Sequence, residues 1–88
     1  MKKYSVRLKR SAVKEIENIP RKADRRRIMA KIGGLADNPR PIGCQKLAGK
    51  NRYRIRQGVY RILYSIEDDI LTVYVVKVAH QRNVYRGH

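Results

Sequence analysis

The chain has 88 residues, of which 22 are Lys or Arg and 7 are Asp or Glu, so its formal net charge is +15. A chain of this length predicts a single domain, residues 1–88, with one modest core. Leu, Ile and Val together supply 22 of the 88 residues, which exceeds the roughly 20% below which charged chains stay disordered, so the chain is expected to fold.

The distribution of apolar residues and cysteine argues against three classes of protein: membrane-spanning, secreted and zinc-binding. The longest apolar run lies within residues 70–79 and contains Lys77, so no segment predicts a membrane span. The N-terminal residues lack the apolar stretch of a signal peptide. Cys44 is the single cysteine, and no Cys/His cluster has zinc-ligand spacing, so no metal or cofactor is predicted. We expect a reducing, cytoplasmic setting in which Cys44 packs in or beside the core.

The first half of the chain predicts one strand and two helices. Residues 3–8 alternate apolar and polar side chains, as in a half-buried strand. Ser11 stands where a helix N-cap is expected, and Pro20 should end that first helix. A second helix is predicted over residues 21–36, ending before Pro39. The apolar faces of the two helices comprise Ala12, Val13, Ile16, Ile19, Ile28, Ile32 and Leu35.

The second half predicts strands over residues 45–47, 51–56, 60–66 and 70–79, the last buried on both faces. The tyrosines in these strands are expected in the core: Tyr53, Tyr60, Tyr64 and Tyr74. A strand, two helices and then several strands indicate an α+β fold, with the two N-terminal helices packed on one face of a mainly antiparallel sheet of 4–5 strands.

Basic residues follow the strands without acidic neighbours. No acid occurs between Asp37 and Glu67, where the chain carries seven bases: Arg40, Lys46, Lys50, Arg52, Arg54, Arg56 and Arg61. The two-residue period of a strand puts Arg54 and Arg56 on one face, and Arg61 of the next strand can lie beside them. Converging guanidinium groups favour a phosphate or carboxylate ligand. The pattern therefore indicates binding to a polyanion, and the alternative is a solvated basic face without a ligand.

Several other residues are candidates for a site. Tyr85 lies in the polar tail between Arg82 and Arg86, where it is expected either to stack on a base or to act as an acid/base group. His80, just after the last strand, is a second candidate acid/base group. The bases of the helical segments have three open interpretations: a second polyanion contact, an ordinary solvent-facing helix surface, or a surface for an acidic peptide. These bases are Lys9, Arg10, Lys14, Arg25, Arg26 and Arg27.

The chain resembles the RelE/ParE toxin superfamily of bacterial and archaeal toxin–antitoxin systems. The resemblance extends along nearly the whole chain, and it depends on the order and spacing of several short motifs. They are Tyr4-Ser5-Val6 followed by Ser11-Ala12, Asn38-Pro39-Arg40-Pro41 with Gly43, Lys46-Leu47-Ala48-Gly49, the segment from Tyr53 to Tyr64, Val78-Ala79-His80-Gln81-Arg82, and Val84-Tyr85-Arg86.

The resemblance implies a RelE-like sheet of the microbial-ribonuclease type. It also implies a cytoplasmic acidic antitoxin, similar to RelB, that covers the basic surface in a heteromeric toxin–antitoxin complex. In the RelE branch, the toxin inhibits translation by cleaving messenger RNA in the ribosomal A site. The 2′-hydroxyl attacks the adjacent phosphate, and the reaction needs no metal. The resemblance therefore implies an endoribonuclease whose partners are the ribosome and messenger RNA, with no membrane.

Matching the family motifs residue by residue implies specific roles. Arg61 and Arg82 would hold the cleaved phosphate, and Arg54 and Arg56 would bind the flanking backbone or the leaving oxygen. Tyr85 would stack on a base or relay a proton. Further RNA contacts are expected from Lys46, Lys50, Arg52 and Arg86.

The identity of the general base is left open by one departure from the family. Some members have lysines at the positions of Arg54 and Arg56, and a lysine among cations can lose its proton, whereas arginine cannot. The base here would therefore be Tyr85, His80 or hydroxide from solvent.

Two other functions are consistent with the sequence. ParE-like toxins share the fold but poison DNA gyrase by binding it without chemistry, and they need no basic catalytic cluster. A basic RNA- or ribosome-binding module without toxic activity would bind RNA with a steep salt dependence and yield no product.

Overall fold

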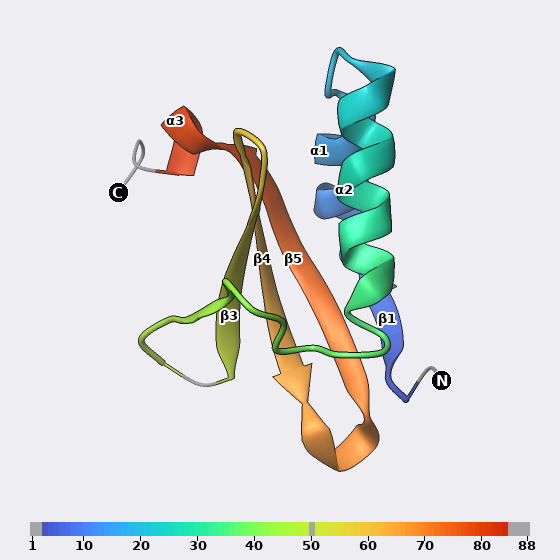
Figure 1. Cartoon of the computed structure of the whole chain (residues 1–88), viewed down its shortest axis with the longest axis vertical. Coiled ribbons are helices and arrows are strands. Elements are labelled where there is room, and N and C mark those ends of the chain that lie inside the picture. The colour runs from blue at the N-terminus through green and yellow to red at the C-terminus, as the bar shows by residue number, and fades with distance from the viewer. Residues whose placement is uncertain (1–2, 50, 85–88) are drawn as a thin grey trace.

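The computed structural model describes residues 3–49 and 51–84 and shows an α+β fold (Figure 1). Two helices cover one face of a five-stranded sheet whose strand order is β1-β5-β4-β3-β2. The elements in chain order are β1 (Ser5–Leu8), α1 (Arg10–Glu17), α2 (Lys22–Gly34), β2 (Gln45–Lys46), β3 (Arg52–Gln57), β4 (Tyr60–Glu67), the 3₁₀ turn η1 (Asp68–Ile70), β5 (Thr72–His80) and α3 (Gln81–Val84). The predicted fold class is confirmed.

The sheet is antiparallel except at one edge. β1 pairs with β5 in parallel, and the β5–β4, β4–β3 and β3–β2 pairs are antiparallel. Parallel strands need a crossover between them, and the crossover from β1 includes both helices, which is why the helices lie on a single face. The β4–β5 register shifts between Leu63 and Tyr64, so residues beyond this bulge are displaced relative to a regular ladder.

The core lies between the helices and the face of the sheet that they cover. Its largest fully buried side chains are Ile28, Ile32, Leu35, Ile62, Tyr64, Ile66, Val73 and Val75. Alternate residues of β4 point into this core, as the two-residue period predicts. No helix in the described ranges is long and apolar enough to cross a membrane.

The start of α1 differs from the prediction. Lys9 occupies the N-cap position and Ser11 lies inside the first turn, so Ser11 does not cap the helix. The backbone N–H of Lys9 donates to Val75 O at 2.9 Å. Because this pairing with β5 holds Lys9 in extended backbone, the helix begins directly after it. The helix also ends at Glu17, before Pro20, although the side chain of Ile19 is still buried.

β5 is buried on one face and not on both, contrary to the prediction. Val73 and Val75 are fully buried, whereas Tyr74 is 38% exposed. The physical reason is that the helices cover a single face of the sheet, so alternate residues of even a central strand reach the open face. The prediction of a core tyrosine is confirmed for Tyr53 and Tyr64, and Tyr60 is half-buried against the core.

Candidate functional site: an arginine pocket on the open face of the sheet

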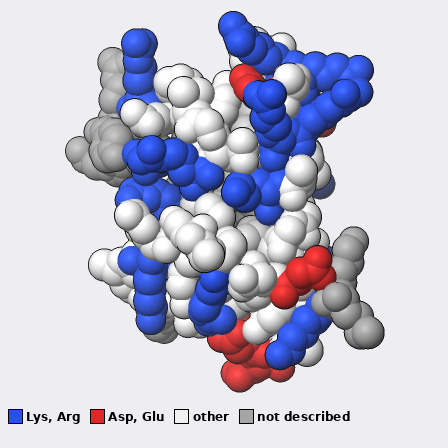
Figure 2. Space-filling model, in the orientation of Figure 1, with Lys and Arg blue, Asp and Glu red and all other residues white. Residues whose placement is uncertain are grey.

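Charge is unevenly distributed over the molecule. Figure 2 shows Lys and Arg side chains over much of the visible upper part, whereas Asp and Glu gather mainly at the lower end, where β4 and β5 are connected. The acids at that connection are Glu67, Asp68 and Asp69. An approaching polyanion would therefore be attracted to the end of the molecule opposite this connection.

Three arginines lie together on the face of the sheet that the helices leave open. Arg56 of β3 is the register partner of Arg61 of β4, and Arg54 is paired with Leu63. Directly paired residues of antiparallel strands share a face, as do residues two apart along a strand. Arg54, Arg56 and Arg61, together with Gly43 and Gln45, line a pocket of about 320 Å³. We call it the arginine pocket, and it confirms that the three side chains are neighbours.

The three guanidinium groups differ in their surroundings. Arg61 is only 7% exposed, and its partner on β5 is the small Ala79. The Arg54 Nη2 donates a hydrogen bond to Gln45 Oε1, which holds this side chain over the pocket. Arg56 is exposed. A buried arginine flanked by two more accessible ones is suited to hold an anion at the base of the pocket.

The connector before β2 forms one wall of the arginine pocket. The Tyr64 hydroxyl donates to Pro39 O at 2.7 Å inside the protein, and burial raises the pKa of this phenol above its usual value. Gly43 then turns with φ at 96°, a conformation that favours glycine. These two features fix the path of the connector and so bring Gly43 and Gln45 to the pocket.

The chemistry available in the arginine pocket is electrostatic. Its lining contains no acid, and arginine donates hydrogen bonds in a planar fork that matches phosphate oxygens. Arginine does not lose its proton in proteins, so none of the three side chains can act as a general base. The pocket can bind a phosphate and stabilise additional negative charge on it, while proton transfer must come from another group.

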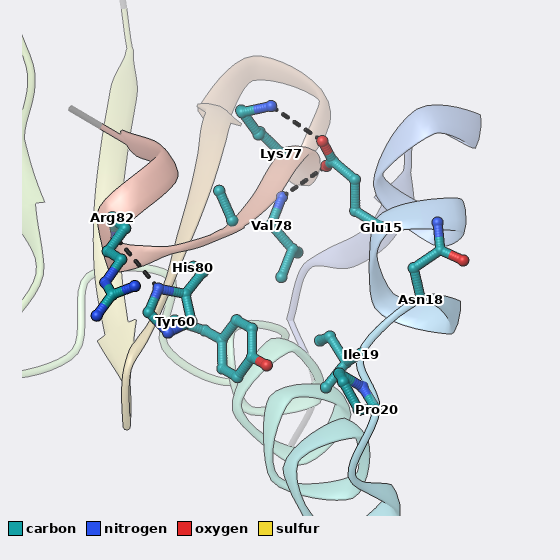
Figure 3. Close-up of a pocket in the computed structure, with 10 residues that line it drawn as sticks. Glu15, Asn18, Ile19, Pro20, Tyr60, Lys77, Val78, His80 and Arg82 are labelled. Atoms are coloured by element: carbon teal, nitrogen blue, oxygen red, sulfur yellow. Dashed lines mark hydrogen bonds and ion pairs between the residues drawn. The ribbon is translucent and has the colours of Figure 1, made fainter. Parts of the chain in front are cut away.

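Arg82 and His80 line a different pocket. This second pocket, of about 510 Å³, lies between the end of α1 and the end of β5, and Tyr60 contributes to it (Figure 3). The rings of Tyr60 and His80 meet edge to face with centroids 5.6 Å apart. The backbone N–H of Arg82 donates to His80 Nδ1 at 3.2 Å. We call this second pocket the β5-end pocket. Arg82 lines the β5-end pocket and is not among the residues that line the arginine pocket.

The predicted RNA-binding residues do not all lie on the same face of the sheet. Arg52 is exposed and shares the face of Arg54 and Arg56, whereas Lys46 is paired with Tyr53 and therefore follows the opposite face. Three of the predicted site residues lie outside the described residues: Lys50, Tyr85 and Arg86.

Arg40, which the sequence places in the acid-free run, is neutralised by a distant acid. Its Nη2 lies 2.9 Å from Asp68 Oδ2, and its Nε donates to the Tyr53 hydroxyl at 3.1 Å. The hydrogen bond to Asp68 raises the pKa of Arg40, and that same bond, with a second from Tyr4, lowers the pKa of Asp68. Arg40 thus belongs to a structural cluster that joins the connector to the β4–β5 turn.

Sequence reasoning missed two residues of the arginine pocket and two of the β5-end pocket. Gln45 reaches Arg54 only because β2 pairs with β3 in one particular register, and Gly43 follows from the connector path. Glu15 and Asn18 belong to the last turn of α1 and its C-cap. The spacing of Glu15 and Asn18, three residues apart, was the available signal, because such residues share one face of a helix.

Comparison with known proteins places this geometry in a family. The sequence-family model described as the ParE toxin of the type II toxin–antitoxin system parDE matches residues 6–85. Toxin RelG of Mycobacterium tuberculosis (strain ATCC 25618 / H37Rv) is 30% identical over 86 residues, covering 94% of this chain and 97% of that protein.

Solved structures show the same fold. The archaeal RelE–RelB complex from Pyrococcus horikoshii OT3 contains a chain that superposes with a TM-score of 0.82 at 27% identity, covering 97% of this chain and 99% of that one. A chain of the intact E. coli RelBE toxin–antitoxin complex gives 0.76 at 22% identity, covering 88% and 95%. The chain is therefore a type II toxin of the RelE/ParE superfamily.

Proposed function

We propose that this toxin is a metal-independent endoribonuclease that cleaves messenger RNA in the ribosomal A site and so inhibits translation. The observation that carries the proposal is the arginine pocket, in which Arg56 and Arg61 are direct cross-strand partners and Arg54 is their neighbour. Three clustered guanidinium groups repel each other, and an anion bound between them would relieve this repulsion and accept their hydrogen bonds. We also propose that residues 1–88 form one RelE-like domain.

The proposed reaction is attack of the RNA 2′-hydroxyl on the adjacent phosphorus. The new oxygen–phosphorus bond forms as the bond to the 5′-oxygen breaks, which gives a cyclic phosphate and a 5′-hydroxyl product. Arg61, at the base of the pocket, would bind the equatorial phosphate oxygens, and Arg56 would stabilise the leaving oxygen. The 2′-hydroxyl proton would be taken by Tyr85, by His80 or by hydroxide from solvent, and the leaving oxygen would be protonated from water.

His80 has a defined hydrogen-bonding arrangement in this scheme. Its Nδ1 accepts from the Arg82 backbone, so the proton of the neutral ring lies on Nε2. His80 therefore presents a donor toward the β5-end pocket rather than a free basic nitrogen. This favours Tyr85 or solvent hydroxide as the base.

The partners that we propose are the ribosome, messenger RNA and an acidic, RelB-like antitoxin in a heteromeric complex in the cytoplasm. The net charge of +15 supports polyanionic and acidic partners, and the archaeal RelE–RelB complex supports the antitoxin. An acidic chain over the arginine pocket would both block RNA and relieve the repulsion among the arginines.

Primer extension on messenger RNA bound to programmed ribosomes tests the proposal, with naked RNA as a parallel lane. We expect a break in the A-site codon with the wild-type protein, and its loss in Arg56→Gln. Arg7→Gln is the matched control, because Arg7 is an exposed arginine of the edge strand β1 and lines neither the arginine pocket nor the β5-end pocket. Wild-type cleavage by Arg56→Gln, or equal loss in both variants, would refute the role of the pocket.

Gyrase poisoning is the second candidate function, because the matching family model describes a ParE toxin. It predicts no RNA product in any lane and inhibition of DNA supercoiling by the purified protein. It also predicts that Arg54→Gln and Arg56→Gln remain toxic. Absence of both activities would leave a basic RNA- or ribosome-binding module, recognised by salt-dependent RNA binding without a product.

A further inference from the structure

The β5-end pocket is built as a ligand site and is separate from the arginine pocket. Its volume of about 510 Å³ falls within the range of pockets that hold small ligands. Apolar walls come from Ile19, Pro20 and Val78, and polar groups enter from α1, β4, β5 and α3. Figure 3 shows the Tyr60 side chain lying between His80 and the Ile19–Pro20 segment. This combination of flat apolar surface and a few polar groups is what recognition of an aromatic ring requires.

Glu15 is held at the wall of the β5-end pocket by two hydrogen bonds. Its Oε2 accepts from Lys77 Nζ at 2.9 Å, and its Oε1 accepts from the Val78 backbone N–H at 2.9 Å. A carboxylate has about four acceptor positions, so each oxygen can accept one more hydrogen bond. The ion pair and the backbone contact therefore fix the direction of Glu15 without exhausting its capacity.

Three other side chains supply the remaining hydrogen-bonding groups. Asn18 and Tyr60 also line the β5-end pocket, and the Asn18 amide and the Tyr60 hydroxyl can each donate and accept hydrogen bonds. His80 offers its Nε2–H, since Nδ1 is already engaged. The edges of nucleobases carry donors and acceptors in alternation, and the β5-end pocket offers both kinds.

The position of the β5-end pocket relates it to the arginine pocket. Arg61 pairs with Ala79, and the next rung of the ladder pairs Tyr60 with His80. Successive residues of a strand point to opposite faces, so the two pockets lie on opposite faces at the same end of the sheet. Arg82 belongs to α3, which follows β5 directly, and it lines the β5-end pocket, where its guanidinium group can bind a phosphate.

We propose that the β5-end pocket binds a nucleotide of RNA, with its base against the Tyr60 ring and the Ile19–Pro20 segment, its edge toward His80, and its phosphate on Arg82. Proteins recognise single-stranded RNA by taking unstacked bases onto aromatic side chains and hydrogen-bonding their edges. The identity of the ligand as RNA rests on the proposed function. Glu15 and Asn18 then read the edge of the base, and the pocket gives the toxin a preference among sequences that the arginine pocket alone cannot provide.

Titration of the full-length protein with each of the four nucleoside 5′-monophosphates, followed by NMR, tests the pocket without reference to cleavage. We expect shifts in the Asn18 amide and His80 imidazole signals. Tyr60→Phe and Asn18→Ala should each weaken binding by roughly 2–10-fold, the effect of one lost hydrogen bond. Tyr74→Phe is the matched control, because Tyr74 is an exposed tyrosine of β5 outside this pocket. Shifts confined to Arg54, Arg56 and Arg61 would overturn the proposal.

Cleavage on programmed ribosomes with different A-site codons identifies the source of the base. A changed order of codon preference in Tyr60→Phe and Asn18→Ala supports a messenger RNA base, and an equal loss at every codon supports a ribosomal RNA base. Wild-type rates and codon order in both variants would overturn the proposal. If the wild-type protein cleaves nothing, the proposed function fails, and the NMR titration still decides whether the pocket binds a nucleotide.

Discussion

Removing one member of the Arg56–Arg61 pair should stabilise the folded toxin. The two arginines are direct register partners, and Arg61 is 7% exposed. Side chains directly opposite each other start about 5.5 Å apart, where two unit charges repel by roughly 0.75 kcal/mol in water and roughly 3 kcal/mol at an effective dielectric constant of 20. Because the long side chains can diverge, we take a value near the lower limit, about 1 kcal/mol. Arg56→Gln should therefore raise the melting temperature by roughly 4–8 °C for a domain of this size.

Calorimetry in low salt and in about 1 M KCl measures this effect, and phosphate is omitted from the buffer because it would bind the pocket. Screening at about 1 M salt shortens the Debye length to roughly 3 Å, so the gain should become smaller there, although salt screens the buried Arg61 guanidinium less than an exposed one. Arg52→Gln removes the same net charge opposite Ser65 and should change the melting temperature little. An equal gain in Arg52→Gln, a gain independent of salt, or destabilisation by Arg56→Gln would refute the reasoning.

Four further predictions concern Tyr64, Asp68 and Arg54. Tyr64→Phe removes the buried hydrogen bond to Pro39 O and should destabilise the fold by about 1–3 kcal/mol; chemical denaturation measures this, and an unchanged midpoint would contradict it. The pKa of Tyr64 is raised in the folded protein, so the unfolded chain loses this proton at a lower pH than the folded one. The free energy of unfolding of the wild type should therefore fall as pH rises above the ordinary tyrosine range. In Tyr64→Phe the free energy of unfolding should fall less steeply with pH. Asp68→Asn should have a lower melting temperature than the wild type at neutral pH, because the pKa of Asp68 is lowered by its hydrogen bond with Arg40. This difference in melting temperature should disappear in acid, where the wild-type carboxyl is protonated. A difference that stays constant with pH would argue against the ion pair. Arg54→Gln should reduce the slope of log affinity for single-stranded RNA against log salt by about 0.7, and filter binding that gives the wild-type slope would place Arg54 outside the RNA contact.

Most of the strands and helices and one face of the site could be predicted from the order of the amino acids. The two-residue alternation of β3 and β4 assigned Tyr64 to the core and Arg54 and Arg56 to a common face, and the structure agrees. The acid-free run predicted a basic half of the molecule. These inferences succeeded because the periodicity of a strand is local: it depends on neighbouring residues in one segment and not on distant partners.

Which charges remain available to a ligand depends on contacts between distant parts of the chain. Arg40 has the same charge as Arg54, but Asp68, 28 residues further along the chain, neutralises it. His80 and Arg82 follow β5 into a pocket completed by Glu15 of α1. Such contacts depend on the order and register of strands and on how the helices cross the sheet, which long-range packing decides. Local pattern places a side chain on a face, and the fold determines what that face meets.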